Sequence, residues 1–196
     1  MRAALPAGPL WQRLTLDLLI WAPPVLGPLT FTLVGLLGVS AVWLEDPPDS
    51  GTLVLFGQRR LHLPYSKTRA YCYMVSLGIL AALVSSVLDH ARTGFTHPAI
   101  WGGTAVGIFG MVVAASLGGL AQPTRGDLYT YLVAMLLLLL IGPLGTYFHV
   151  QANLVGKSTI VIERFLRGAP FLAPLLYTNM GVLGLIALLD PREPLK

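Results

Sequence analysis

The sequence predicts an all-α, polytopic integral membrane protein, a bundle of about five transmembrane helices. Hydrophobic residues make up 55% of the 196 residues and charged residues only 11%, and the mean hydropathy is +0.71, which is too apolar for a water-soluble globule. Each of five stretches without Asp, Glu, Lys or Arg can hold the roughly 20 residues that cross a bilayer as a helix. These stretches are 18–44, 70–88, 93–124, 128–156 and 168–189. Runs such as YLVAMLLLLLIG lack the alternation of a membrane barrel strand, so helices are expected.

The chain begins with a segment, 1–17, that we expect to lie at the membrane interface. Its GPLWQRLTLDLL motif places apolar residues at helical spacing with two charges between them, a pattern typical of an interfacial helix. The first span is assigned to 18–44. Because the sequence WAPPVLGPL in this span contains three prolines, its regular helix is expected to start only near Leu29, with 18–28 as an interfacial or partly inserted entry.

The remaining elements follow from the charge gaps and from turn residues. The loop after the first span contains two extended-looking runs, TLVLF and LHLP, separated by GQRR, which predicts a short hairpin on the membrane surface between helices one and two. The segment VQANLVGKSTIVIERFLR alternates apolar and polar groups, as an amphipathic surface helix does. The predicted bounds are a surface loop at 45–69, spans at 70–90, 98–121 and 128–149, an amphipathic linker at 150–167, and a fifth span at 168–190.

Small residues form a stripe along the third span. They recur at three- and four-residue intervals, and such stripes let another membrane helix approach closely. The stripe comprises Gly103, Gly107, Gly110, Ala114 and Gly118. Gly181 and Gly184 have the same spacing in the fifth span, and Asn179 is its main amide. We interpret all of them as helix-packing positions without chemistry, Asn179 included.

Five polar side chains are predicted to share one side of the membrane. Counting crossings places the turn after the second span, the end of the fourth span and the following linker together. The residues are Asp89, His90, His97, His149 and Glu163, while His62 lies on the other side. The Lys and Arg residues divide almost evenly between the two sides, so the positive-inside rule does not orient the chain.

The shared polar side is open to three interpretations. The side chains can simply hydrogen-bond water and headgroups at span ends, with Asp89 paired to Arg92 or Arg164. His90, His97, His149, Asp89 and Glu163 can ligate zinc, copper or non-haem iron, although no HExxH motif or ExxH pair is present. His90 and His149 can serve as axial haem ligands, because their helices run in the same direction and end at similar depth. Separately, Arg164 and Arg167 can hold a lipid phosphate.

Other function classes find no support in the sequence. NLVGKST ends like a phosphate loop, but Gln151 stands where the motif needs glycine, so no nucleotide is expected. No basic stripe with aromatics indicates nucleic acid, no GxSxG motif indicates a hydrolase, and no catalytic residue is assigned. We therefore expect a non-catalytic accessory subunit of a larger complex, respiratory or photosynthetic, that contacts lipid and other membrane subunits in a bacterial-type inner membrane. The alternative is a small membrane metalloprotein or b-type cytochrome with ligands from the His90/His97/His149 face.

Overall fold

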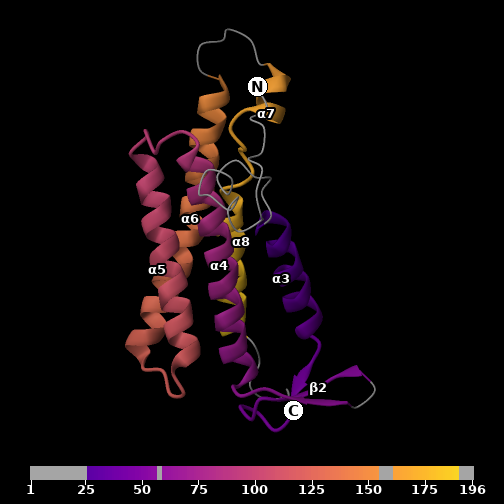
Figure 1. Ribbon diagram of the computed structural model, residues 1–196. Coiled ribbons are helices and arrows are strands. Elements are labelled where there is room, and N and C mark those ends of the chain that lie inside the picture. The colour runs from indigo at the N-terminus through magenta and orange to yellow at the C-terminus, as the bar shows by residue number, and fades with distance from the viewer. Residues whose placement is uncertain (1–25, 57–58, 155–160, 190–196) are drawn as a thin grey trace, which may run out of the picture.

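The computed structural model describes residues 26–56, 59–154 and 161–189 (Figure 1). Within these residues the chain is mostly helical, with six helices and one small sheet. The elements are α3 Leu26–Ser40, β1 Leu44–Glu45, β2 Thr52–Val54, β3 Arg60–His62, α4 Lys67–Ala91, α5 Ala99–Gly119, α6 Arg125–Leu154, α7 Ile162–Arg167 and α8 Leu175–Leu188. The expected interfacial segment 1–17 lies outside the described residues.

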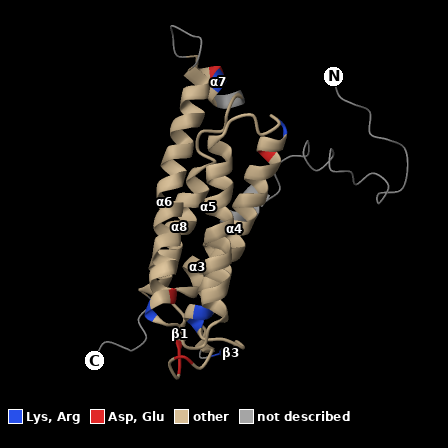
Figure 2. Cartoon of the chain, turned by 90° about the vertical axis from the view of Figure 1, so that its left-hand side faces the viewer, with Lys and Arg blue, Asp and Glu red and all other residues tan. Residues whose placement is uncertain are grey.

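Three of the described helices are long and apolar enough to cross a membrane. They are α4, α5 and α6, of 25, 21 and 30 residues. At a rise of about 1.5 Å per residue they measure about 38, 32 and 45 Å, and each exceeds the roughly 30 Å hydrocarbon core of a bilayer. Figure 2 shows the charged residues at the two ends of the bundle, with uncharged residues between them. This distribution is what a lipid environment requires.

Two of the five expected spans are shorter as helices. α3 has 15 residues and α8 has 14, and α8 measures only about 21 Å. The fifth span was expected at 168–190, but the helix starts at Leu175, since Pro170 and Pro174 interrupt the residues before it. In the described residues of the linker expected at 150–167, the structure has the end of α6 and the short helix α7.

α6 starts before the expected residue 128 because its start is capped, and it also continues past 149 to Leu154. The Asp127 carboxylate accepts bonds from the Thr124 amide and hydroxyl at 2.8 and 2.7 Å, and the Thr124 hydroxyl accepts one from the Asp127 amide at 3.2 Å. This reciprocal arrangement is a capping box, which satisfies amides that a helix start leaves free. Pro143 lies inside α6 without ending it, as membrane helices tolerate.

Most glycines of the two predicted stripes lie at close contacts between helices. A Cβ built on Gly107 would lie 3.0 Å from Leu83 on α4, and one on Gly110 would lie 2.7 Å from Leu138 on α6. On α8, Gly181 and Gly184 meet Met135 in the same way. Gly103 differs, because no described atom lies within 4 Å of its Cβ position. The helix interfaces are therefore close contacts that larger side chains would not permit.

Hydroxyl groups add hydrogen bonds between the helices. They bond to backbone carbonyls of neighbouring helices, and such bonds contribute about 0.6 kcal/mol each on average inside membranes. The bonds are Tyr131 to the Gly184 carbonyl at 3.0 Å, Ser76 to Met111 at 2.9 Å and Thr178 to Leu139 at 3.3 Å. Asn179, expected to hold helices together, instead lies exposed on the outside of α8.

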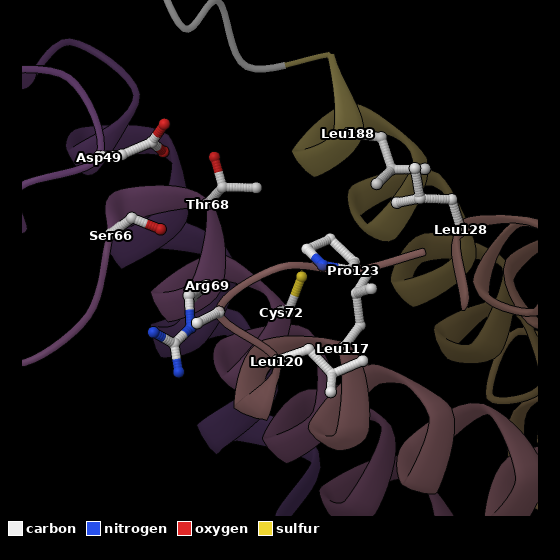
Figure 3. Close-up of a pocket in the computed structure, with 11 residues that line it drawn as sticks. Asp49, Ser66, Thr68, Arg69, Cys72, Leu117, Leu120, Pro123, Leu128 and Leu188 are labelled. Atoms are coloured by element: carbon white, nitrogen blue, oxygen red, sulfur yellow. The ribbon is translucent and has the colours of Figure 1, made fainter. Parts of the chain in front are cut away.

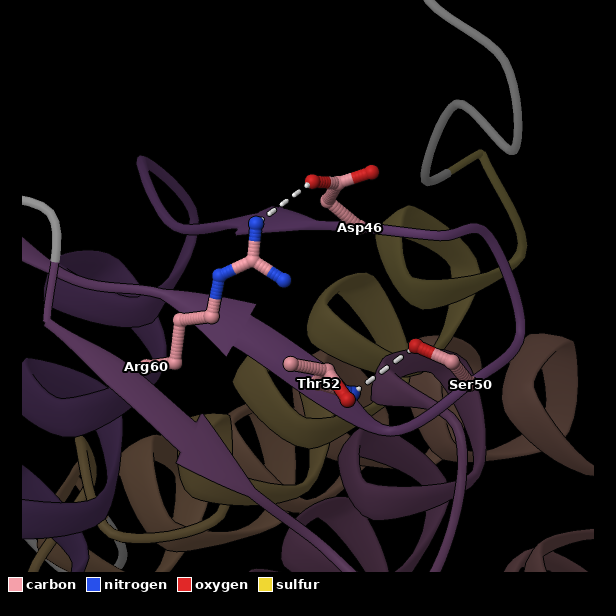
Figure 4. A network of polar contacts seen from close by, with 4 residues as sticks. All are labelled: Asp46, Ser50, Thr52 and Arg60. Atoms are coloured by element: carbon pink, nitrogen blue, oxygen red, sulfur yellow. Dashed lines mark hydrogen bonds and ion pairs between the residues drawn. The ribbon is translucent and has the colours of Figure 1, made fainter.

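The sheet lies at the end of the bundle where α3 finishes and α4 begins (Figure 1). It is antiparallel in the order β1-β2-β3, with Leu53 opposite both Glu45 and Leu61. Two polar contacts lie beside it: the exposed Arg60 pairs with Asp46 at 3.3 Å, and the Thr52 amide donates to the Ser50 hydroxyl at 3.0 Å (Figure 4).

Glu45 attaches this sheet to α4. Its Oε1 accepts bonds from the amides of Gly51 and Lys67 at 2.6 and 3.1 Å. Gly51 has φ +74°, and a Cβ there would meet the carbonyl oxygens of Leu63 and Tyr65. Only glycine fits such a position without strain. The loop is thus fixed against the start of α4.

Candidate functional site

The histidine end of the bundle is formed by residues 89–98, 147–154 and 162–170. His90 lies one residue before the end of α4, and His149 lies in the penultimate turn of α6. Their ring centroids are 5.9 Å apart with the planes at 88°. Two histidines that are 59 positions apart in the sequence are therefore neighbours, at the depth where α4 and α6 both approach their ends.

A carbonyl fixes the orientation of the His149 ring. Its Nδ1 lies 3.0 Å from the carbonyl oxygen of Pro170. Because a carbonyl can only accept, Nδ1 carries the proton and donates, so in the neutral ring Nε2 keeps its lone pair. Histidines that bind metals commonly have their second nitrogen held in this way.

The other predicted site residues each have a different neighbour. The His97 ring lies 5.7 Å from that of Phe148, and its Nδ1 accepts a bond from the Ala99 amide at 3.3 Å. Asp89 pairs with Arg92 at 3.4 Å, one of the two partners that the sequence suggested for it. Glu163 lies in the first turn of α7.

The five predicted metal ligands are not all gathered. No group of three or more His, Cys, Asp or Glu side chains arranged for a metal ion occurs in the part of the chain that the structure describes. His90 and His149 are brought together, and His97 lies on the same end against α6. The histidine pair is thus the part of the predicted set that the fold makes available.

Asn153 is a structural residue that the sequence did not reveal. It is 5% exposed, its Nδ2 donates to the Ala169 carbonyl and its Oδ1 accepts from the Ala169 amide, both at 2.9 Å. Together with His149 it fixes the connection between α7 and α8 to the last turns of α6. An amide near the end of an amphipathic run gives no distinctive sequence signal, because its partner lies 16 residues away.

Of the two arginines predicted to bind a lipid phosphate, the structure describes the side chain of only one. Arg164 is half-buried, and its Nη1 donates to the Asn153 carbonyl at 3.2 Å. This arginine therefore helps to close the histidine end. The side chain of Arg167 lies outside the described part of the chain.

The histidine end offers few functional groups. It offers one oriented imidazole nitrogen beside a second imidazole, an ion pair and a buried amide. These groups can bind a metal ion or exchange a proton, and they can equally close a helix bundle. No protein-family model, curated protein or solved structure matches the chain.

Proposed function

We propose that this chain is a non-catalytic structural or accessory subunit of a larger, energy-transducing assembly in a bacterial-type inner membrane. The observation that supports this proposal best is the position of Asn179. Its side chain is exposed on α8, whereas Tyr177, Met180 and Gly184 on the opposite face of the helix are buried.

Asn179 lies at the depth of the hydrocarbon core. Its neighbour Thr178 bonds to the carbonyl of Leu139, which is the middle of the 30-residue helix α6. Val182 and Ile186, three and seven residues further along α8, are also exposed, so the amide belongs to an otherwise apolar outer face.

An amide that faces lipid needs a partner. Burying a polar group without a hydrogen bond costs several kcal/mol in hydrocarbon, and asparagine side chains in membrane helices usually bond across to another helix. Among the described residues the side-chain amide of Asn179 has no hydrogen bond. A helix of another subunit placed along Asn179, Val182 and Ile186 would supply one.

Replacement of Asn179 tests the subunit proposal. We expect Asn179→Leu to reduce the amount of partner subunits that co-purify in mild detergent, and Asn179→Gln to retain them. Because the amide makes no bond to the described bundle, Asn179→Leu should leave the melting temperature of the isolated chain unchanged. Val182→Leu, on the same face, is the matched control. Unchanged co-purification with Asn179→Leu would count against the proposal.

A small membrane metalloprotein or b-type cytochrome is the second candidate function. The observation in its favour is the His90 and His149 pair, with the ring of His149 held by the Pro170 carbonyl. Two imidazoles suit zinc, copper or iron, and two axial histidines suit haem. A metal held here would take its remaining ligands from water or from another subunit.

An absorption spectrum and a metal analysis of the purified protein test this candidate. Haem would give a Soret band that both His90→Ala and His149→Ala abolish, whereas a metal ion would be present in stoichiometric amount without that band. His62→Ala is the control, because His62 lies in β3 at the opposite end. If neither a Soret band nor a stoichiometric metal ion were found, the metalloprotein and cytochrome candidates would be excluded and only the accessory role would remain.

A further inference from the structure

A cavity of about 250 Å³ lies at the end of the bundle opposite the histidines. It is bounded by the start of α4, the end of α5, the start of α6 and the end of α8. Figure 3 shows the polar side chains of Asp49, Ser66 and Thr68 on one side of it, leucines on the other, and the Cys72 sulfur between them. This volume is below the roughly 300–1,000 Å³ of pockets that enclose drug-sized ligands, so the cavity suits a small group.

One wall of the cavity offers hydrogen-bond donors without partners. Ser66 precedes the first residue of α4, and its side chain makes no capping bond. It is only 9% exposed, and Figure 3 shows its hydroxyl directed into the cavity. The Thr68 hydroxyl and the amides of Thr68 and Arg69 also have no hydrogen-bond partner among the described residues. Free amides at the positive end of a helix dipole bind phosphate groups readily.

Arg69 adds positive charge at this wall and is held in place. Its Nε donates to the Gly118 carbonyl at 2.8 Å and its Nη2 to the Gly119 carbonyl at 3.0 Å. The guanidinium also lies 5.3 Å from the centre of the Tyr65 ring. These contacts join the start of α4 to the end of α5, so the donor wall is preorganised for a ligand.

The rest of the lining limits what the ligand can be. Asp49 carries a negative charge at the rim and has no ion-pair partner among the described residues, so a simple anion would be repelled there. A ligand with a cationic group beside its anionic group would satisfy both. Leu117, Leu120 and Leu128 form the opposite, apolar side. The cavity lies where α4 and α6 begin and α5 ends, which is the depth of lipid headgroups in a bilayer.

We propose that this cavity binds the zwitterionic phosphoethanolamine headgroup of a membrane phospholipid. The phosphate accepts hydrogen bonds from Ser66, Thr68 and the free amides of α4. The ammonium group pairs with Asp49, and the acyl chains leave along the leucines toward the hydrocarbon.

The only cysteine of the chain makes occupancy measurable. Cys72 lines the cavity and is 1% exposed, so a small alkylating reagent reaches it only when the helices around the cavity open, and a bound headgroup should suppress that opening. We expect short-chain phosphatidylethanolamine, added to delipidated protein in detergent, to slow Cys72 alkylation. Native mass spectrometry should show the same lipid retained in preference to phosphatidylglycerol.

Three variants separate the contributions. Leu120→Trp should fill the cavity and abolish lipid retention, and Leu120 is exposed enough to accept a larger side chain. Ser66→Ala combined with Thr68→Val should weaken binding of both lipids. Asp49→Asn should reduce the preference for ethanolamine over glycerol headgroups by about two- to fivefold, the range of an exposed ion pair. Asp46→Asn is the matched control, because Asp46 lies in the same loop and pairs with Arg60 instead.

The outcomes distinguish binding of the whole lipid headgroup from binding of a phosphate ion. Protection of Cys72 by inorganic phosphate as strong as that by the lipid would overturn the headgroup assignment. Equal retention of both lipids by the wild-type protein would overturn the role of Asp49. Lipid retention that Leu120→Trp leaves unchanged would place the lipid elsewhere and end the proposal. Co-purification of partner subunits is a separate measurement, so failure here does not affect the proposed subunit role.

Discussion

Asn153 makes two hydrogen bonds to one residue, Ala169. The donor and the acceptor of its amide meet the carbonyl and the amide of the same peptide backbone, as a neighbouring strand would. The backbone before α8 contains Pro170 and Pro174, and proline lacks an amide hydrogen. Side-chain bonds from α6 therefore supply the attachment that this segment cannot make through regular structure.

We predict that Asn153→Ala destabilises the protein measurably. Removal of the amide leaves the Ala169 N–H and carbonyl without these partners in a largely buried place, at a cost of about 1–3 kcal/mol. Thermal unfolding in detergent, followed by circular dichroism, measures the change. Asn179→Ala is the matched control, because that amide is exposed and should leave the midpoint unchanged. Equal midpoints for the two variants would show that the Asn153 bonds contribute little.

Single polar residues were the hardest to assign from sequence. The sequence placed Asn179 in a helix contact, but in the structure its side chain is exposed on the outer face of α8. Asn153, which the sequence did not single out, is buried instead. Which face of α8 is internal depends on Gly181 and Gly184 packing on α6, and Asn179 lies two residues before Gly181, on another face of the helix. The His90 and His149 contact follows from two parallel helices, but the bond from His149 to Pro170 depends on the path of the α7–α8 connection.

At the scale of elements, the contact between α6 and α8 is limited by backbone atoms. A Cβ on Gly181 would lie 2.7 Å from the carbonyl oxygen of Met135 and 2.9 Å from the amide nitrogen of Leu139. Backbone atoms cannot rotate away as a side chain can, so a methyl group here has to separate the two helices.

We predict that Gly181→Ala destabilises the bundle by about 1–3 kcal/mol through this overpacking. Gly103→Ala provides the comparison, because no described atom lies within 4 Å of its Cβ position, and alanine is the better helix former. Unfolding midpoints in detergent measure both. A Gly181→Ala protein as stable as the wild type would mean that α6 and α8 can separate without loss.

The sequence predicted the long helices better than the short ones. Three gaps between charges became α4, α5 and α6, since an uncharged run of this length has few alternatives in lipid. The helix in the expected fifth span starts only at Leu175, because the charge-free stretch that defined the span also contains Pro170 and Pro174. The sequence predicted two strands in the loop after the first span and missed β1. This strand has only two residues, too few for a periodic pattern to reveal.

The whole molecule separates two polar ends by an apolar middle. The histidine end and the end with the sheet and the cavity lie at opposite ends of the bundle (Figure 1). The spans α4, α5 and α6 run up, down and up between them. An odd number of crossings after the sheet thus brings α7 to the side opposite β3.

We predict that this arrangement appears as sided chemical labelling. In a Cys72→Ser background, Thr96→Cys and Glu163→Cys, both exposed, should react with an impermeant maleimide from the same side of sealed vesicles. Arg60→Cys should react only from the other side. Labelling of positions 96 and 163 from opposite sides would contradict the crossing count, and labelling of all three without detergent on one side would contradict a membrane-spanning bundle.

α6 and α8 differ in length, so the regular helical surface that the bundle offers to lipid is not equally tall on all sides. α6 measures about 45 Å and α8 about 21 Å, although the two lie in direct contact. A bilayer adjusts to such mismatch by thinning beside the short helix or by tilt of the protein. Shorter acyl chains should therefore collect next to α8, and membranes of different thickness should hold this protein at different angles.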